Sequence, residues 1–429
     1  MSAPVARSRR LPELGLGLIA VIVALVGYVL VAVARNANLP PDLWALLAAM
    51  FGLFVVAHIT VRRLAPNATA TLLPLAAFLN GLGFVMISRI DRDLARTQAL
   101  WTAIGIGAFI VTLVVVKRVR DLEQFRYTAL FLGIFALLLP LVPGIGLTVN
   151  GARIWIKLGP MQVQPGEAAK VLLIVFFAAY LTEKRELIGG QGLRGGGLLR
   201  HLLPLVLAWG ASMLVLVFEK DLGTSLIIFL LFAGLVYMAT NRARYALGSI
   251  AVFVASAAVA YQLFGHVRER VQVWLDPWKD AAGKGYQIVQ ASFAFGSGGF
   301  TGRGLGLGSV EKIKIPAAET DSIFVVIGEE LGFFGTVAIV IALLLIAGAG
   351  FRIAATAQRP FTKLFSAGLT MLLAFQAFVI IGGITRVIPL TGVVLPFISY
   401  GGSSLVSSWI IIALLIRMSD EVANEAIES

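Results

Sequence analysis

Long apolar runs recur along almost the whole chain of 429 residues, separated by short polar connections. About 20 apolar residues in helical conformation cross the hydrocarbon core of a bilayer. The pattern therefore predicts an all-α polytopic membrane protein with little room for a separate globular domain. Twelve membrane-spanning helices are expected, at residues 12–34, 43–61, 71–88, 98–116, 127–142, 167–182, 202–218, 224–240, 246–264, 323–348, 364–386 and 403–416.

Basic residues in the short connections predict the orientation, because loops rich in Lys and Arg stay on the cytoplasmic side. Starting from the basic N-terminal tail, every second connection carries such residues. Both termini are therefore expected in the cytoplasm, and the long segment 265–322 outside. The residues that support this are Arg62 and Arg63, Lys117, Arg118 and Arg120, Lys184 and Arg185, Arg242 and Arg244, Arg352, and Arg417.

Composition supports the membrane prediction and narrows the chemistry. Hydrophobic residues make up 59% of the chain and charged residues only 14%, against about 25% charged residues in a soluble domain. The net charge of +12 would suggest nucleic acid in a soluble protein, but a bilayer explains it better here. The absence of cysteine excludes disulfides, thiolate-bound zinc, iron–sulfur clusters and cysteine nucleophiles.

Metal and nucleotide sites have no sequence signature in this chain. The three histidines lie in separate regions and form no recognisable ligand pair. Gly283-Lys284 is followed by Gly285 and not by the Ser or Thr of a P-loop. No cofactor is evident. A divalent cation such as Mg or Mn, held by outer carboxylates and a pyrophosphate, is chemically reasonable but has no dedicated spacing.

The informative polar residues lie at the predicted outer ends of helices. Glu167 and Lys170 are three residues apart and share a helix face. At membrane depth such charges are costly unless they pair or face a wet cavity, so they are candidate functional residues. A structural ion pair is the alternative. Arg153, close to Trp155, is either a ligand contact or an interfacial anchor.

The long segment 265–322 combines cations with carboxylates. Arg268 and Arg270 can bind pyrophosphate through bidentate hydrogen bonds. A nearby aspartate can accept a proton from a hydroxyl group. Asp276 precedes a proline and is expected to form a turn, so Asp280 is the better candidate base. Solvated surface charge is the alternative for both aspartates.

Three further polar clusters need an explanation. The first, Glu219–Asp221, lies between two helices and is either functional or a tight charged turn. The second cluster is the pair Glu329 and Glu330, adjacent inside an apolar run. Their side chains are expected to point in different directions, and one of them to pair across the bundle. The segment 389–404 is rich in Pro, Gly and hydroxyl residues, which predicts irregular backbone facing a cavity, with Arg386 as partner of an outer carboxylate.

Taken together and in this order, these clusters resemble the SEDS family of bacterial cell-wall polymerases, the RodA and FtsW proteins. The resemblance covers about residues 71–417, and its actinobacterial RodA-like members share two additional N-terminal helices. The matching strings are Asn150–Arg153 with Trp155, Gln164-Pro165 with Glu167–Lys170, Asp221–Thr224, Asp276-Pro277 with Asp280 and Gly285–Gln287, Gly296–Gly299, Thr320-Asp321 with Gly328–Gly332, and Leu395-Pro396 with Ser399–Ser404.

The resemblance implies a division of the chain. Residues 1–70 would hold the N-terminal tail and the two additional helices, residues 71–417 the ten-helix catalytic core with its long outer loop 265–322, and residues 418–429 a cytoplasmic tail. It also implies a partner, a class B penicillin-binding protein whose transpeptidase cross-links the new glycan.

The activity implied by the resemblance is peptidoglycan glycosyl transfer on the outer face of the cytoplasmic membrane, for cell-wall elongation and cell shape. Lipid II would be polymerised and undecaprenyl pyrophosphate released. Asp280 would activate the acceptor 4-hydroxyl, so that attack on an α-linked donor gives a β-1,4 link by inversion. The supporting residues are Glu167 and Lys170, expected near Asp280, Arg153, Arg268 and Arg270 toward the pyrophosphate, and Asp321 and Ser403 within matching strings.

Some positions depart from the family pattern. Glu219-Lys220 stand where the family usually has Gln-Pro, which puts substrate contacts there in doubt. A septal, FtsW-like polymerase is the alternative within the family. A lipid II flippase and a non-enzymatic scaffold for the penicillin-binding protein are the alternatives outside it.

Overall fold

The computed structural model describes residues 4–36, 43–149, 151–159, 161–189, 196–309 and 315–428. Within these residues the chain forms fourteen α-helices, three short 3-10 helices and one small sheet. It divides into two compact units. Unit 1 comprises residues 1–117, 269–349 and 376–429, and unit 2 comprises residues 118–268 and 350–375.

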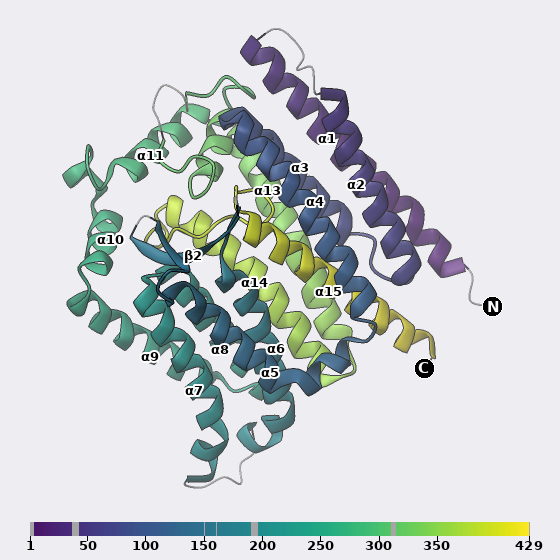
Figure 1. The fold of residues 1–429 in the computed structure, drawn as a ribbon, viewed down its shortest axis with the longest axis vertical. Helices are drawn as coiled ribbons and strands as arrows, with labels where there is room; N and C mark the ends of the chain where they lie inside the picture. Colours follow the sequence, from purple (N-terminus) through teal and green to yellow (C-terminus); the bar gives the residue numbers. More distant parts are fainter. Residues whose placement is uncertain are drawn as a thin grey trace. The chain divides into compact units, whose positions relative to one another are not determined.

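Unit 1 is built from long helices that pack side by side. α1 packs along α3, and α4 along α15 (Figure 1). Close approach is possible because glycine stands at the crossings: a Cβ on Gly105 would lie 2.6 Å from the Trp409 ring. The elements are α1 (Pro4–Asn36), α2 (Leu43–Leu64), α3 (Leu72–Ile90), α4 (Arg92–Val115), most of α10 (Gly265–Leu275), η3 (Pro277–Asp280), α11 (Tyr286–Gly298), most of α13 (Ile323–Thr356), the second part of α14 (Pro360–Ile384) and α15 (Gly402–Glu428).

Unit 2 is a second helical group, in which α6 packs against α5, α7 and α8. Its small antiparallel sheet has the order β1-β2-β3, with Gly146 opposite Ile156 and Lys157 opposite Gln162. The elements are η1 (Val119–Phe125), α5 (Arg126–Leu138), η2 (Leu139–Leu141), β1 (Gly146–Val149), β2 (Ala152–Leu158), β3 (Met161–Val163), α6 (Pro165–Gly189), α7 (Gly196–Glu219), α8 (Leu222–Thr240) and α9 (Ala243–Leu263), with the end of α13 and the first part of α14.

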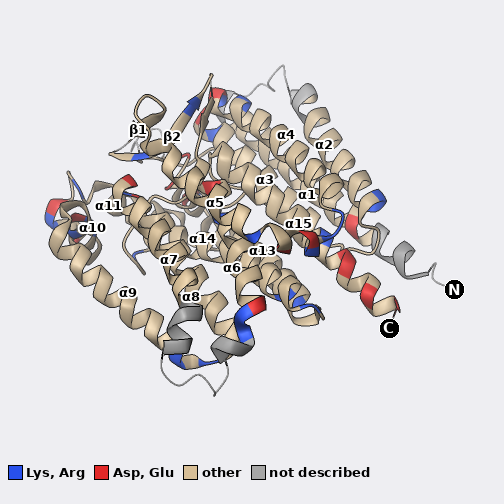
Figure 2. Ribbon diagram, turned by 60° about the horizontal axis from the view of Figure 1, so that its bottom comes forward, with Lys and Arg blue, Asp and Glu red and all other residues tan. Residues whose placement is uncertain are grey.

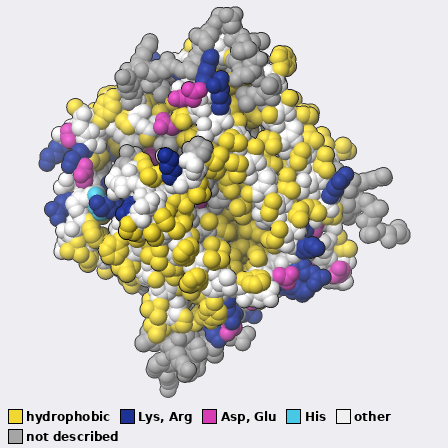
Figure 3. Space-filling model, viewed as in Figure 1, with side chains coloured by type: hydrophobic (Ala, Val, Ile, Leu, Met, Phe, Trp, Pro, Cys, Tyr) yellow, Lys and Arg dark blue, Asp and Glu magenta, His cyan; other side chains and the backbone are white. Residues whose placement is uncertain are grey.

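The helical membrane character predicted from the sequence is confirmed. Ten helical stretches among the described residues are long and apolar enough to cross a membrane. Charged residues gather at helix ends and in connections, whereas the helix bodies are largely uncharged (Figure 2). Hydrophobic side chains cover much of the face seen in Figure 3, as expected for a surface in contact with lipid.

Three features differ from the sequence-based expectation. The sheet at 146–163 lies where a loop was expected. The long segment 265–322 contains the helices α10, η3 and α11. α15 continues without a break to Glu428, so the predicted tail 418–429 is helical over most of its length. This extension is held in place, because the Asp420 carboxylate accepts a hydrogen bond from the Asn67 backbone N–H at 2.7 Å.

Candidate functional site

Asp280 ends the short helix η3 and is held in a tight turn. Its backbone carbonyl accepts hydrogen bonds from the N–H groups of Gly283 and Gly285, and its Oδ2 accepts one from the N–H of Lys284 at 3.0 Å. Glycine is required around it: a Cβ on Gly283 would lie 2.5 Å from Asp280 Oδ1, and one on Gly285 2.0 Å from the Pro277 carbonyl oxygen. The carboxylate is therefore oriented by the backbone while its side chain stays exposed.

A cation lies next to this turn. The Lys284 ammonium group pairs with Glu269 of α10 at 3.2 Å, so the residue that donates its backbone N–H to Asp280 also ties the turn to α10. Asp276, by contrast, caps η3: its Oδ1 accepts from the Trp278 N–H at 3.1 Å. The expectation that Asp276 forms a turn is confirmed.

Arg270 and Asp321 form a second charged group in unit 1. Arg270 donates to the Leu390 carbonyl at 2.6 Å, and its positive charge acts on Asp321. Burial raises the pKa of the Asp321 carboxyl to about 6, against the opposing effect of Arg270, while Glu319 raises it further. The carboxyl is thus able to exchange a proton near neutral pH.

Hydrogen bonds join the segment around Asp321 to parts of the chain that are far away in sequence. Gln287, in the first turn of α11, donates to the Ser322 hydroxyl at 3.0 Å, and the Ser399 hydroxyl donates to the Thr320 carbonyl at 2.8 Å. Ser403 lies buried in the first turn of α15, shortly after Ser399 in the chain. Unit 1 therefore links the start of α11, the segment before α13 and the segment before α15 in one network.

The segment 385–401 has irregular backbone, as the sequence predicted. Arg386, Gly392 and Phe397 have positive φ there. The predicted partner of Arg386 was wrong: its guanidinium group donates to the backbone carbonyls of Trp274 and Leu275, at 3.1 and 3.2 Å, and it forms no ion pair with any described carboxylate. Helix ends expose carbonyl groups without helical partners, and here the arginine satisfies those of α10.

Glu329 and Glu330 are both fully buried, but their carboxylates do not point apart as expected, because a Cβ on Gly308 would lie 2.7 Å from Glu330 Oε1 and 3.2 Å from Glu329 Oε2. Glu330 pairs with Arg89 of α3 at 2.9 Å and accepts hydrogen bonds from the N–H groups of Gly306 and Gly308. Glu329 accepts from Arg303 at 3.1 Å. The two carboxylates thereby fix the glycine-rich segment 302–308 on α13, and the predicted pairing across the bundle is confirmed.

Glu167 and Lys170 are the charged pair of unit 2. Both are buried in the first turns of α6, and Lys170 Nζ lies 2.9 Å from Glu167 Oε1. The negative charge at Glu167 also suits the positive end of the helix dipole. Their predicted proximity to Asp280 stays a prediction, because Asp280 belongs to the other unit.

Two arginines of unit 2 bind backbone carbonyls. Arg153 of β2 donates to Val142 at 3.0 Å, which ties the sheet to the end of η2. Arg268 donates to Gln262 at 2.9 Å and lies over the Tyr261 ring, at the C-terminal end of α9. The contact of either arginine with pyrophosphate stays a prediction.

The cluster at residues 219–221 is a tight turn. Lys220 has positive φ, and Asp221 caps α8 by accepting a hydrogen bond from the Thr224 N–H at 2.9 Å. Glu219 is different, because it is buried and its Oε1 has no hydrogen-bond partner among the described residues. The turn accounts for Lys220 and Asp221, whereas the buried Glu219 carboxyl is not explained by it.

Some features escaped the sequence analysis. Asn150-Gly151 is a strong hairpin signal, and it would have predicted the turn between β1 and β2; Asn150 itself lies outside the described residues. Gln287 and Ser322 carry no local signal, because their contact joins elements far apart in sequence. Among the described residues no group of three or more His, Asp or Glu side chains is arranged to hold a metal ion, and the divalent cation stays an expectation.

Comparison with known proteins extends these findings. Residues 69–424 match the family model FtsW/RodA/SpoVE, described as cell cycle protein. Peptidoglycan glycosyltransferase RodA of Mycobacterium tuberculosis is 41% identical over 98% of this chain and 93% of its own. The corresponding protein of Mycobacterium leprae is 42% identical over 86% and 81%. A probable peptidoglycan glycosyltransferase FtsW of a Geobacter species is 38% identical over 69% and 79%.

Two solved structures have a similar fold. A chain from a peptidoglycan synthase complex, described as coordinating polymerization and crosslinking, superposes with a TM-score of 0.68 at 26% identity, over 83% of this chain and 98% of that one. The crystal structure of the rod shape determining protein RodA of Thermus thermophilus gives a TM-score of 0.59, also at 26% identity, over 82% and 96%.

Proposed function

This chain belongs to the FtsW/RodA/SpoVE family, and we propose on that basis that it works as a peptidoglycan glycosyltransferase of the RodA type, polymerising lipid II into glycan strands and releasing undecaprenyl pyrophosphate. The observation that carries the proposal is similarity to RodA proteins over nearly the whole chain. The FtsW relative covers only 69% of it, which favours cell-wall elongation over septal synthesis.

Asp280 is the base of the proposed reaction. It takes the proton of the acceptor 4-hydroxyl, whose oxygen attacks the anomeric carbon of the donor, and the bond to the pyrophosphate breaks with inversion. The backbone turn that orients its carboxylate supplies the fixed geometry that general-base catalysis needs. Arg270, Arg268 and Arg153 are proposed to face the pyrophosphate, with Glu167, Lys170, Asp321 and Ser403 in supporting positions.

The proposed topology has twelve membrane crossings with both termini in the cytoplasm. α2, with 22 residues, and the apolar part of α7, Leu203–Glu219, are added to the ten candidate spans. Asp280 and the rest of the segment 265–322 then lie outside the cytoplasmic membrane, where lipid II is displayed. Residues 1–70 form an addition to a catalytic core at 71–417, and 418–429 form the cytoplasmic end.

The proposed partner is a class B penicillin-binding protein, in line with the synthase complex that shares this fold. The activity test uses the purified full chain with that partner, whose transpeptidase is blocked. Lipid II should be converted into a glycan ladder that a muramidase digests. A flippase would instead move labelled lipid II across vesicles without making polymer, and a scaffold would do neither, so absence of the ladder contradicts the proposal.

A further inference from the structure

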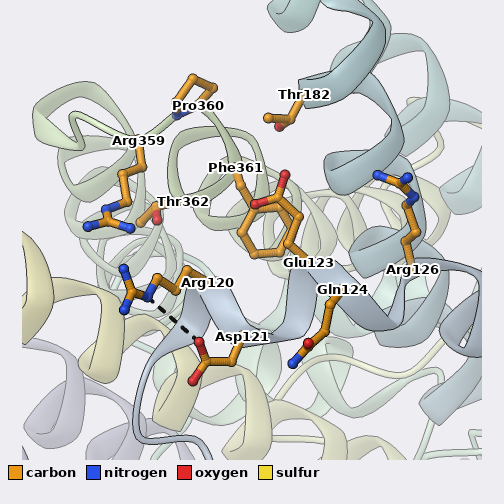
Figure 4. Close-up of a pocket in the computed structure, with 10 residues that line it drawn as sticks. All are labelled: Arg120, Asp121, Glu123, Gln124, Arg126, Thr182, Arg359, Pro360, Phe361 and Thr362. Carbon is orange, nitrogen blue, oxygen red and sulfur yellow. Dashed lines mark ion pairs between the residues drawn. The ribbon is translucent and has the colours of Figure 1, made fainter.

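The cavities of this chain differ in their lining. A cavity of about 590 Å³ in unit 2, where η1, α6 and the start of α14 meet, is lined largely by charged and polar residues (Figure 4). Its charges face one another, because Arg120 pairs with Asp121 at 3.7 Å and the positive charge of Arg126 acts on Glu123. A further cavity, of about 330 Å³ in unit 1, has a mainly apolar lining, and the proposed polymerase reaction does not use it.

The apolar cavity lies between α2, α3 and α4, which follow one another in the chain and lie side by side (Figure 1). Its lining residues fall between 48 and 56 in α2, between 80 and 84 in α3 and between 99 and 103 in α4. At 1.5 Å per residue these positions are about 8–20 Å from the start of α2, the end of α3 and the start of α4. Half of the hydrocarbon core of a bilayer is about 15 Å thick. The cavity is therefore at the depth of lipid tails and below the headgroups.

The two polar residues in the lining, Asn80 and Thr102, are hydrogen-bonded within the protein. Asn80 Nδ2 donates to the Thr102 hydroxyl at 3.2 Å, and this hydroxyl donates to the Gln98 carbonyl at 2.9 Å. The rest of the lining consists of Ala, Gly, Val, Leu, Met and Phe, and it contains no charged residue. This environment suits a hydrocarbon chain and gives a headgroup no charged partner.

The dimensions of the cavity distinguish a lipid chain from a helix of another protein. The lining extends over about 12 Å along the helices, and dividing 330 Å³ by this length gives a mean width of about 6 Å. An α-helix with its side chains is about 10–12 Å wide. Carbon atoms pack about 3.5–4.0 Å apart, so an extended hydrocarbon chain is about 4–5 Å wide. The cavity therefore has room for one hydrocarbon chain and is too narrow for a helix.

The cavity opens on the lipid-facing surface of α2. Ala48 is exposed at its rim, and so is Val56. Gly52 lies between them and keeps the surface hollow, since a Cβ there would meet no atom within 4 Å. Met50, which also lines the cavity, packs against the buried cluster of α1 and α3. A chain that enters from the bilayer therefore contacts α2 on one side and the helices α3 and α4 on the other.

We propose that this cavity binds the end of one phospholipid acyl chain, and that the bound chain fastens the additional helix α2 to the catalytic core. The site depends on the membrane crossing proposed above for α2 and on no step of the polymerase reaction. A phospholipid acyl chain is unbranched, whereas the polyprenyl chain of lipid II is widened by regular methyl branches. The unbranched chain is the better match to a width of about 6 Å.

Photolabelling of the full wild-type chain in nanodiscs tests the proposal without any variant. The nanodiscs consist of phosphatidylglycerol with a small fraction that carries a diazirine, either near the methyl end of one acyl chain or beside its ester. Asn80, Phe84 and Thr102 are at most 6% exposed, so lipid that only surrounds the protein does not reach them. The terminal diazirine should label these residues and the diazirine beside the ester should not, whereas both should label the fully lipid-exposed α9. Absence of label from all three residues would overturn the proposal.

Variants test whether the chain occupies the cavity. Gly52→Leu should lower this labelling about tenfold, the loss expected when two methylene groups of the chain are displaced. Gly107→Leu is the matched control, because it adds the same side chain in open space on α4 but outside the cavity, and it should label as wild type does. Unchanged labelling of folded Gly52→Leu protein would contradict the site.

Competition identifies the chain. Phosphatidylglycerol without a diazirine should compete for the cavity, and undecaprenyl phosphate at the same concentration should not. Stronger competition by undecaprenyl phosphate would overturn the assignment to a phospholipid. The nanodiscs contain no lipid II, so these outcomes are independent of polymerase activity. Label on Phe51, which is 47% exposed on α2, tests the membrane crossing of α2 separately, and its absence would contradict both the crossing and the site.

Discussion

Replacing Arg89 by methionine removes one partner of a buried ion pair and keeps a similar side-chain volume. Arg89 is 2% exposed and Glu330 0%, and the two are 2.9 Å apart. In Arg89→Met the carboxylate keeps only the N–H groups of Gly306 and Gly308, at 2.8 and 3.3 Å. Breaking a buried pair costs about 3–5 kcal/mol. Because two N–H donors remain on the carboxylate, the expected loss of unfolding free energy is about 3 kcal/mol, at the lower end of this range.

The assay is thermal unfolding of the purified chain in detergent micelles. At about 2–4 °C per kcal/mol, Arg89→Met should lower Tm by roughly 6–12 °C. The double variant Arg89→Met/Glu330→Gln has no unpaired charge, and a double-mutant cycle should give a coupling energy of about 2 kcal/mol. Arg96→Met is the control, because Arg96 pairs with Asp93 at 3.3 Å on an exposed surface and should change stability by less than about 0.5 kcal/mol.

Two results would refute this reasoning. One is a Tm loss for Arg89→Met as small as that of Arg96→Met. The other is a double variant whose loss equals the sum of the two single losses, since the carboxylate would then not depend on Arg89.

Three further predictions concern the site and its supports. Gly283→Ala should lower polymer formation about tenfold or more at unchanged Tm, because its Cβ would displace the Asp280 carboxylate, whereas Gly296→Ala, with open space around it, should keep wild-type activity. Asp321→Asn should remove a pH dependence of Tm. Because the pKa of Asp321 is raised to about 6 in the folded chain, this carboxyl contributes stability below about pH 4 that is lost as pH rises through about 6. A constant Tm difference between wild type and variant over pH 4–7 would contradict this. Gly306→Ala should lower Tm, since the residue has φ +80° and its Cβ would lie 2.8 Å from the Ala34 Cβ. Gly107→Ala is the control and should leave Tm unchanged, because a Cβ there meets no neighbour. Equal Tm values for the two variants would show that α1 does not hold the segment 302–308.

The helices were predictable because membrane insertion depends on local hydrophobicity, which the sequence displays directly. The sheet at 146–163 was missed because its strands are short and only half-buried, so hydrophobicity gives a weak signal; the turn residues Asn150-Gly151 were the better indicator. The end of α15 was placed too early because its last turns are polar, and they are held by contacts such as Asn67 with Asp420 that no local pattern shows.

In the candidate site, too, contacts between distant parts of the chain could not be predicted from local sequence patterns. That Glu330 needs a partner follows from its position in an apolar run, but that this partner is Arg89, 241 residues away, depends on how α3 and α13 pack. Arg386 was assigned a carboxylate because arginine usually pairs with one, whereas the exposed carbonyls of α10 took that place. Asp280 was a candidate base from its position near cations, with solvated surface charge as the alternative. The family resemblance then singled it out, and the structure adds the turn that orients it.

The most direct test of the central claim compares two aspartates four residues apart. Polymer formation from lipid II is measured with wild type, Asp280→Asn and Asp276→Asn, each with its penicillin-binding partner and the transpeptidase blocked. Asp276 caps η3, and asparagine can cap in the same way, so Asp276→Asn should make polymer. Asp280→Asn should make none while remaining folded and partner-bound. Equal polymer from Asp280→Asn and wild type would contradict the assignment of Asp280 as the base.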